Sequence, residues 1–183
     1  MSARAGTSAS AAGRIALLRW QFDLTWSLFE YHLERLEPHD LLWEPANLVW
    51  TIRRDPDGNP VPDWSDTEPD PVPVPTIAWL TWHIGWWWSV ALDHAQGDSP
   101  RERSEIRWPG ETPIAVISWL RALRGEWIAV LERLDDGDLD VLAEFPMADD
   151  PDYTVGHMAA WVNAELMKNV AEIGQLRLIR RAA

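Results

Sequence analysis

The sequence predicts an all-α protein, a four-helix bundle with a long connection rich in proline and tryptophan between its first and second helices. Four long segments repeat apolar residues at three- and four-residue steps, which is the spacing of one helix face. None of these segments shows the alternation of apolar and polar residues that is typical of a strand. The irregular stretch 37–75 lies between the first two segments and is too long for a tight turn, so it predicts a crossover connection.

Length, composition and charge favour one domain and exclude several classes of function. The 183 residues, 46% of them hydrophobic and 25% charged, are typical of a single folded domain. Residues 1–13 are small and polar where a signal peptide needs an apolar run, so we expect a flexible leader, one domain over 14–183 and a cytoplasmic location. The formal net charge of -13 would repel nucleic acid or an anionic membrane surface. Because the chain has no cysteine, any thiol chemistry would use a thiol from outside.

The first two helices are delimited by local signals. The first is predicted over 14–36, because Pro38 stops it. The second is predicted over 76–95, where Thr76 can cap its start and Gly97 is placed to end it. Sixteen consecutive residues of this helix are uncharged, which is fewer than a membrane span needs. The pattern therefore predicts a helix buried on nearly all sides, with a dimer face covering one of them.

Two more helices complete the bundle. Thr112 followed by Pro113 predicts the start of the third, since proline fits the first helical position after a hydroxyl cap. An acidic connector follows over 135–152, and the fourth helix is predicted from Thr154 to Arg180. Their inner faces are the rows Ile114, Ile117, Leu120, Leu123, Trp127, Val130 and Leu134, and Val155, Met158, Val162, Leu166, Val170, Ile173 and Leu176.

The chain has 14 tryptophans against three phenylalanines and two tyrosines, which suggests a pocket, a wide core or a buried interface. A candidate ligand pocket consists of Trp79, Trp86, His157 and Trp161. An aromatic-walled pocket with a few polar groups is the usual form of a small-molecule site. The alternative is plain core and interface packing, because helical rows of large residues ordinarily pack that way.

Two segments resemble the DinB-like superfamily of four-helix bundles. Residues 77–84, IAWLTWHI, resemble its second helix, in which a single histidine ligates a metal. Residues 161–173, WVNAELMKNVAEI, resemble its fourth helix, which usually reads HxxxHxGQI. The resemblance implies a DinB-like bundle related to thiol-dependent S-transferases and mycothiol-dependent maleylpyruvate isomerases. It also implies that His83 is one metal ligand, while Glu165 and Asn169 replace the other two histidines.

The residue types at this implied site permit a metal but do not favour a strong one. Glu165 and Asn169 differ by four, so they share a helix face, and a histidine on a facing helix could complete three corners. An amide oxygen binds late divalent metals more weakly than imidazole nitrogen does. We therefore expect no tightly bound cofactor and at most a weakly held zinc or nickel ion. In the alternative interpretation Glu165 pairs with Lys168 on a solvated face, and His83 is a buried structural histidine.

Two classes of function follow, and the residues leave open whether the protein is an enzyme. The first is a non-catalytic DinB-like bundle with a degenerate metal site, which binds an apolar small molecule or a partner. The second, implied by the resemblance, is a metal-dependent S-transferase or isomerase that uses an external low-molecular-weight thiol. In either case we expect a homodimer and no contact with nucleic acid or membrane.

Overall fold

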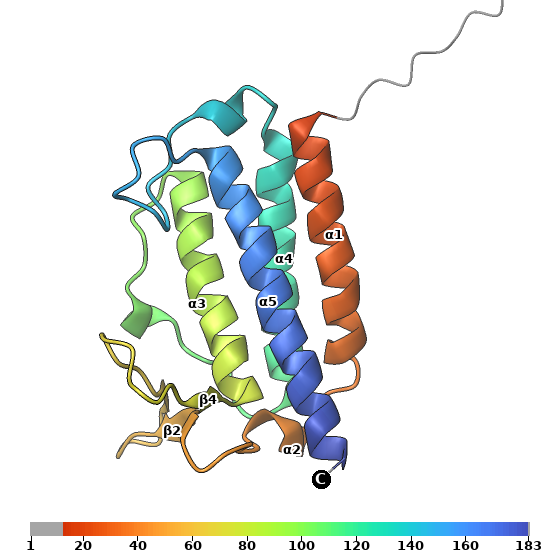
Figure 1. Ribbon diagram of the computed structural model, residues 1–183, viewed down its shortest axis with the longest axis vertical. Helices are drawn as coiled ribbons and strands as arrows, with labels where there is room; N and C mark the ends of the chain where they lie inside the picture. The colour runs from red at the N-terminus through yellow and green to blue at the C-terminus, as the bar shows by residue number, and fades with distance from the viewer. Residues whose placement is uncertain (1–12, 183) are drawn as a thin grey trace, which may run out of the picture.

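The computed structural model describes residues 13–182 and is mostly helical, as predicted. Four long helices lie side by side in Figure 1: α1 Arg14–Leu33, α3 Ile77–Gln96, α4 Pro113–Arg133 and α5 Val155–Ala182. The connections contain the short helix α2 Pro38–Leu41 and two single-turn 3₁₀ helices, η1 Arg103–Glu105 and η2 Asp138–Asp140. The leader predicted over 1–13 lies outside the described residues, apart from Gly13.

The long helices form two parallel pairs. The first and last helices, α1 and α5, are neighbours that run in the same direction, and so are α3 and α4 (Figure 1). The stretch 37–75 stays at one end of the bundle, where α1 ends and α3 begins, whereas the connection 97–112 runs along the whole of α3 (Figure 1). The predicted long connection is therefore present, but the segment that travels the length of the bundle is the later one.

The helix ends follow the local signals in the sequence. The hydroxyl of Thr76 accepts a hydrogen bond from the Trp79 backbone N–H at 3.3 Å, and Gly97 ends α3 in the left-handed region at φ 76°. Helix α1 ends at Leu33, three residues before the predicted end, because the next turn tightens: the Leu36 N–H donates to the Leu33 carbonyl at 3.2 Å.

The stretch between α1 and α3 contains two small strand pairs. Strands β1 Val49–Trp50 and β4 Val74–Pro75 pair in parallel, while β2 Ile52–Arg54 and β3 Pro60–Pro62 form an antiparallel hairpin. Three tryptophans join this segment to the bundle: Trp50 stacks on Trp79 with ring centroids 4.8 Å apart, and Trp64 stacks on both. The Trp79 indole N–H also donates to the Asp63 carbonyl at 2.7 Å. The proline- and tryptophan-rich stretch is thus packed against the start of α3.

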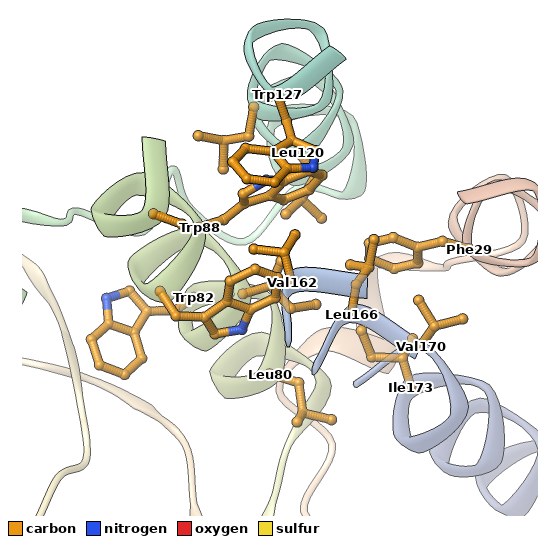
Figure 2. Close-up of a cluster of buried hydrophobic side chains, with 14 of the residues drawn as sticks. Phe29, Leu80, Trp82, Trp88, Leu120, Trp127, Val162, Leu166, Val170 and Ile173 are labelled. Atoms are coloured by element: carbon orange, nitrogen blue, oxygen red, sulfur yellow. The ribbon is translucent and has the colours of Figure 1, made fainter. Parts of the chain in front are cut away.

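Helix α3 supplies much of the core shown in Figure 2, which also shows Phe29 from α1, Leu120 and Trp127 from α4, and four aliphatic residues from α5. Fifteen of the 20 residues of α3 are buried within the single chain. Helices α4 and α5, the connection 97–112 and the strand region provide its cover. The burial that predicted a dimer face on this helix is therefore accounted for inside one chain, and the homodimer stays a prediction.

Side-chain hydrogen bonds fix the connection 97–112 to α3. The Trp82 indole N–H donates to the Ile106 carbonyl at 3.0 Å, and the Trp108 indole N–H donates to the Thr81 hydroxyl at 3.0 Å. Nearer the end of α3, the Arg101 guanidinium binds the buried Asp93 carboxylate with contacts of 2.8 Å. The connection is therefore held at three levels along α3, by two buried hydrogen bonds and one partly buried ion pair. Across residues 13–182, no helix has the length and apolar character needed to cross a membrane.

Candidate functional site

Helices α3 and α5 bring His83 and Glu165 together. The His83 Nε2 atom lies 3.5 Å from the Glu165 Oε1 atom, and each side chain is only 17% exposed. The Lys168 ammonium, one turn further along α5, lies 2.5 Å from the same carboxylate oxygen. The Glu165–Lys168 pairing expected for a helix face is thus present, and the histidine of the facing helix joins it.

The electrostatics of this cluster favour an ionised carboxylate. Burial alone raises the pKa of Glu165, but the hydrogen bonds and charges of His83 and Lys168 outweigh burial and bring that pKa below its ordinary value. Glu165 therefore carries a negative charge at neutral pH, and the Lys168 ammonium balances it.

Tryptophans hold the His83 ring in place. The ring stacks on Trp79 with centroids 4.8 Å apart and planes inclined by 11°, and Trp86 lies 5.7 Å away in a tilted arrangement. The buried Nδ1 atom of His83 has no hydrogen-bond partner within the described chain. Two residues of the predicted ligand pocket, Trp79 and Trp86, thus contact the predicted metal ligand.

Asn169 has a structural role between the two helices. It is 1% exposed, and both ends of its amide are bonded. The oxygen accepts a hydrogen bond from the Trp87 indole at 3.2 Å, and the amide nitrogen donates to Glu172 Oε2 at 2.9 Å. The oxygen is the only atom of the amide able to ligate a cation, and one of its two lone pairs already accepts the Trp87 hydrogen bond.

These contacts fit a tightly bound transition metal poorly. The oxygen of Asn169 is engaged by Trp87, and the Lys168 ammonium lies against the carboxylate that would ligate the ion. Among residues 13–182, no three histidine, aspartate or glutamate side chains are grouped so that they could hold a metal ion. His83 and Glu165 remain as one nitrogen and one oxygen donor, which is fewer than a strong zinc site uses. Weak zinc or nickel binding stays a prediction.

The other two residues of the predicted pocket lie elsewhere. The half-buried Trp161 meets Trp87 edge to face at 5.4 Å, so it contacts the Asn169 network indirectly. The exposed His157 accepts a hydrogen bond from the Thr154 backbone N–H at 3.1 Å. It lines a separate hollow of about 370 Å³ at the start of α1, together with Leu17. The structure thus gathers Trp79 and Trp86 around His83, links Trp161 through Trp87, and leaves His157 apart.

The structure contains a hollow next to Glu172 that the sequence does not predict. It measures about 330 Å³ and is lined by Pro45, Val74, Pro75, Glu172, Gln175, Leu176 and Ile179. In the alternative interpretation of the sequence, Glu172 and Gln175 belong with Glu165 and Lys168 to a solvated face. What turns that face into a hollow is the approach of β4 and Pro45 to the second half of α5, for which no local sequence signal exists. The sequence also does not predict that the Trp87 indole, one turn beyond His83 on α3, donates a hydrogen bond to Asn169.

Comparison with protein families gives a match over most of the chain. The family model described as the DinB superfamily matches residues 21–173, which span α1 to α5 and include His83, Glu165 and Asn169. No curated protein matches the chain. The match covers well over half of the sequence, and the resemblance inferred from residues 77–84 and 161–173 is confirmed. The chain belongs to the DinB superfamily.

Proposed function

We propose that this protein is a non-catalytic binding member of the DinB superfamily with a degenerate metal site. The observation that carries the proposal is the state of Asn169, whose amide bonds Trp87 at one end and Glu172 at the other. A Lewis-acid enzyme needs donor atoms that are available to the ion. Here the donors at the family's metal position form internal contacts, which stabilise the packing of α3 on α5.

The proposed ligand is a small apolar molecule that binds in the hollow beside Glu172. Prolines and aliphatic side chains form most of the lining, and the volume of about 330 Å³ lies at the lower end of the range for small-molecule sites. The polar groups are the carboxylate of Glu172 and the amide of Gln175, so a hydroxyl or amine on the ligand would find an acceptor. Because Glu172 is bonded to Asn169, the former metal position also fixes one wall of the hollow.

A titration tests this site. Uncharged aromatic and aliphatic compounds that carry a hydroxyl or amine are screened by the native tryptophan fluorescence, and affinities are measured by calorimetry. We expect saturable binding by the wild type and a loss of at least about tenfold in Ile179→Trp, because the larger side chain fills the hollow. The matched control is Ile114→Trp at the start of α4, where the side chain is 75% exposed and affinity should not change. Flat titrations, or equal binding by Ile179→Trp, would remove the ligand from this hollow.

The second candidate function is a metal-dependent S-transferase or isomerase that uses an external low-molecular-weight thiol. Two features favour it: an ionised Glu165 lies 3.5 Å from His83 Nε2, and the Nδ1 atom of the same ring is free of partners in the described chain. A carboxylate next to an imidazole is a suitable pair for moving a proton from a bound thiol. The amount of metal in the purified protein distinguishes this candidate from the first, because only the metal-dependent enzyme needs a bound ion.

Metal content and one substitution test the degenerate site. Untagged protein purified without chelator or nickel resin is expected to hold far less than one equivalent of zinc, nickel or iron. Asn169→His should raise zinc affinity by at least about tenfold, or roughly 1.4 kcal/mol, because imidazole replaces an amide. Leu178→His, on the same helix and 58% exposed, is the control and should leave affinity unchanged. Near-stoichiometric metal that disappears in His83→Ala would favour the enzyme, and an unchanged affinity in Asn169→His would show that the three positions do not converge on an ion.

A further inference from the structure

Helix α1 carries a second apolar row on its outer face. Its inner row, which includes Phe22, Trp26 and Phe29, is buried in the bundle. The outer row consists of Leu17, Trp20, Leu24, Leu28 and Tyr31, with exposed fractions of 62%, 62%, 49%, 41% and 49%. Because α1 packs on α4 and α5 at the edge of the bundle, no described segment covers this outer row (Figure 1).

The outer row is large for a surface that only meets water. The five side chains expose on the order of 500 Å² of mostly apolar area, near the upper end of the patches that monomers carry. Aromatic residues are enriched in the cores of protein interfaces, and this row presents an exposed tryptophan and an exposed tyrosine. The row therefore has the composition of an interface.

The spacing of the row identifies its partner. From Leu17 to Tyr31 the steps are three, four, four and three residues, so the row is symmetric about Leu24. If two copies of α1 pack antiparallel around a two-fold axis at Leu24, residues equidistant from Leu24 lie level with each other. Trp20 then meets the partner's Leu28, and Leu17 meets the partner's Tyr31. Such self-complementarity is the requirement for an isologous interface.

Charges at the two ends of α1 favour the same orientation. At the start, the Asp136 carboxylate accepts hydrogen bonds from the Arg14 and Ile15 backbone N–H groups, each at 2.9 Å. The exposed Asp140 carboxylate forms an ion pair with the Arg14 guanidinium at 2.7 Å, so one of the two acidic charges is left unbalanced. At the other end, the Arg35 guanidinium lies over the Tyr31 ring, 3.9 Å from its centroid. Arg35 and residue 13 are both eleven residues from Leu24. Antiparallel packing brings Arg35 level with the partner's Asp136, whereas parallel packing would bring two acidic ends together.

We propose that the outer row of α1 is the interface of a two-fold antiparallel homodimer centred on Leu24. The five side chains supply on the order of 500 Å² of the roughly 800 Å² per subunit that a standard-size interface buries, and residues beside the row would supply the rest. The hollow of about 370 Å³ beside Leu17 lies where the partner's Tyr31 ring arrives, so that ring has a receiving site between α1 and His157. The homodimer predicted from the sequence is thereby assigned to α1 instead of α3.

Solution mass and a charged substitution test the interface. Wild-type protein is expected to sediment at twice the chain mass of 20.9 kDa at micromolar concentration. Leu24→Arg places two like charges at the axis and should weaken dimerisation at least about 100-fold, while the fold is kept because Leu24 is half-exposed. Val61→Arg, on the exposed side of β3 away from α1, is the matched control and should remain dimeric. A monomeric wild type, or a dimer that Leu24→Arg does not weaken, would overturn the proposal.

Cysteine cross-linking tests the register and does not depend on the folding of the charged variant. The chain has no native cysteine, so each introduced thiol is unique. Leu24→Cys should form a disulfide dimer on mild oxidation, because the two copies meet at the axis. Leu17→Cys alone should not form a disulfide dimer, because the two copies of residue 17 lie far from the axis. A mixture of Leu17→Cys and Tyr31→Cys should form one, because residue 17 meets the partner's residue 31. Self-cross-linking of both Leu17→Cys and Tyr31→Cys, each on its own, would indicate parallel packing, and a Leu24→Cys variant that forms no disulfide dimer would refute an axis at Leu24.

Discussion

Replacing Gly85 with alanine is expected to lower the free energy of unfolding by about 3 kcal/mol, near the upper end of the cost of overpacking. Gly85 lies in the middle of α3, where α4 approaches it closely. A Cβ atom added there would lie 1.8 Å from Cη2 and 2.3 Å from Cζ2 of Trp119. An indole ring cannot shorten or fold back, so either the ring or the helix has to move. Urea denaturation measures this loss of stability, and the slope of the free energy of unfolding against urea concentration should be the same in the variant and the wild type.

The control for Gly85→Ala is the same substitution at Gly125. That glycine lies in α4, is exposed, and would bring its new Cβ atom near no other residue. Gly125→Ala is expected to stabilise the protein by about 0.5–1 kcal/mol, because alanine has the higher helix propensity. In the double variant Gly85→Ala/Trp119→Ala the clashing indole is absent, so part of the lost stability should return. The double-mutant cycle should give a coupling free energy of at least about 1 kcal/mol between the two positions. Equal effects at the two glycines would show that α3 and α4 do not approach each other at Gly85.

Trp82→Phe is expected to destabilise the protein by about 3 kcal/mol, and Trp88→Phe by only about 1–1.5 kcal/mol. Both indoles are 0% exposed, so the two substitutions remove the same buried volume. They differ in their polar atoms: Trp82 donates to the Ile106 carbonyl, whereas the Trp88 Nε1 atom has no partner in the described chain. Only Trp82→Phe leaves a buried carbonyl unpaired, which accounts for the expected difference.

Hydrogen exchange separates the hydrogen bond of Trp82 from its packing. In Trp82→Phe the amides of 98–112 should exchange faster relative to those of the α3 core, because the connection loses a point of attachment. In Trp88→Phe the same amides should keep their relative protection. Equal losses of stability in the two variants, with no selective change in 98–112, would mean that the Trp82–Ile106 hydrogen bond does not hold the connection.

The helices could be predicted because their signals are local. The cap at Thr76, the glycine at Gly97 and the proline at Pro113 each act within a few residues, and the structure places helix ends beside all three. The end of α1 was predicted three residues too late, since Pro38 marks the start of the next helix and not the last turn of the one before it. Family membership could likewise be inferred from two short segments at the expected spacing.

The roles of individual side chains depended on contacts between distant segments. Spacing placed Glu165 and Asn169 on one helix face, but it could not show that the Trp87 indole donates a hydrogen bond to the amide oxygen of Asn169. The outer row of α1 illustrates the same difficulty. The three- and four-residue steps of Phe22, Trp26 and Phe29 predict the row that the structure buries, but they do not show that a second apolar row of the same helix stays exposed. That second row is apparent only from the packing of α1 on α4 and α5.

The adjacency of α1 and α5 has a consequence for how the chain acquires its structure. The Asn163 side chain of α5 donates to the Leu18 carbonyl of α1 at 2.9 Å, a contact that joins residues 145 positions apart. During synthesis, the part of the inner row of α1 that packs on α5 therefore stays exposed until α5 has left the ribosome. Ordering so distant a pair carries a large loop-closure entropy, which slows folding and lengthens the exposure of apolar surface in the nascent chain.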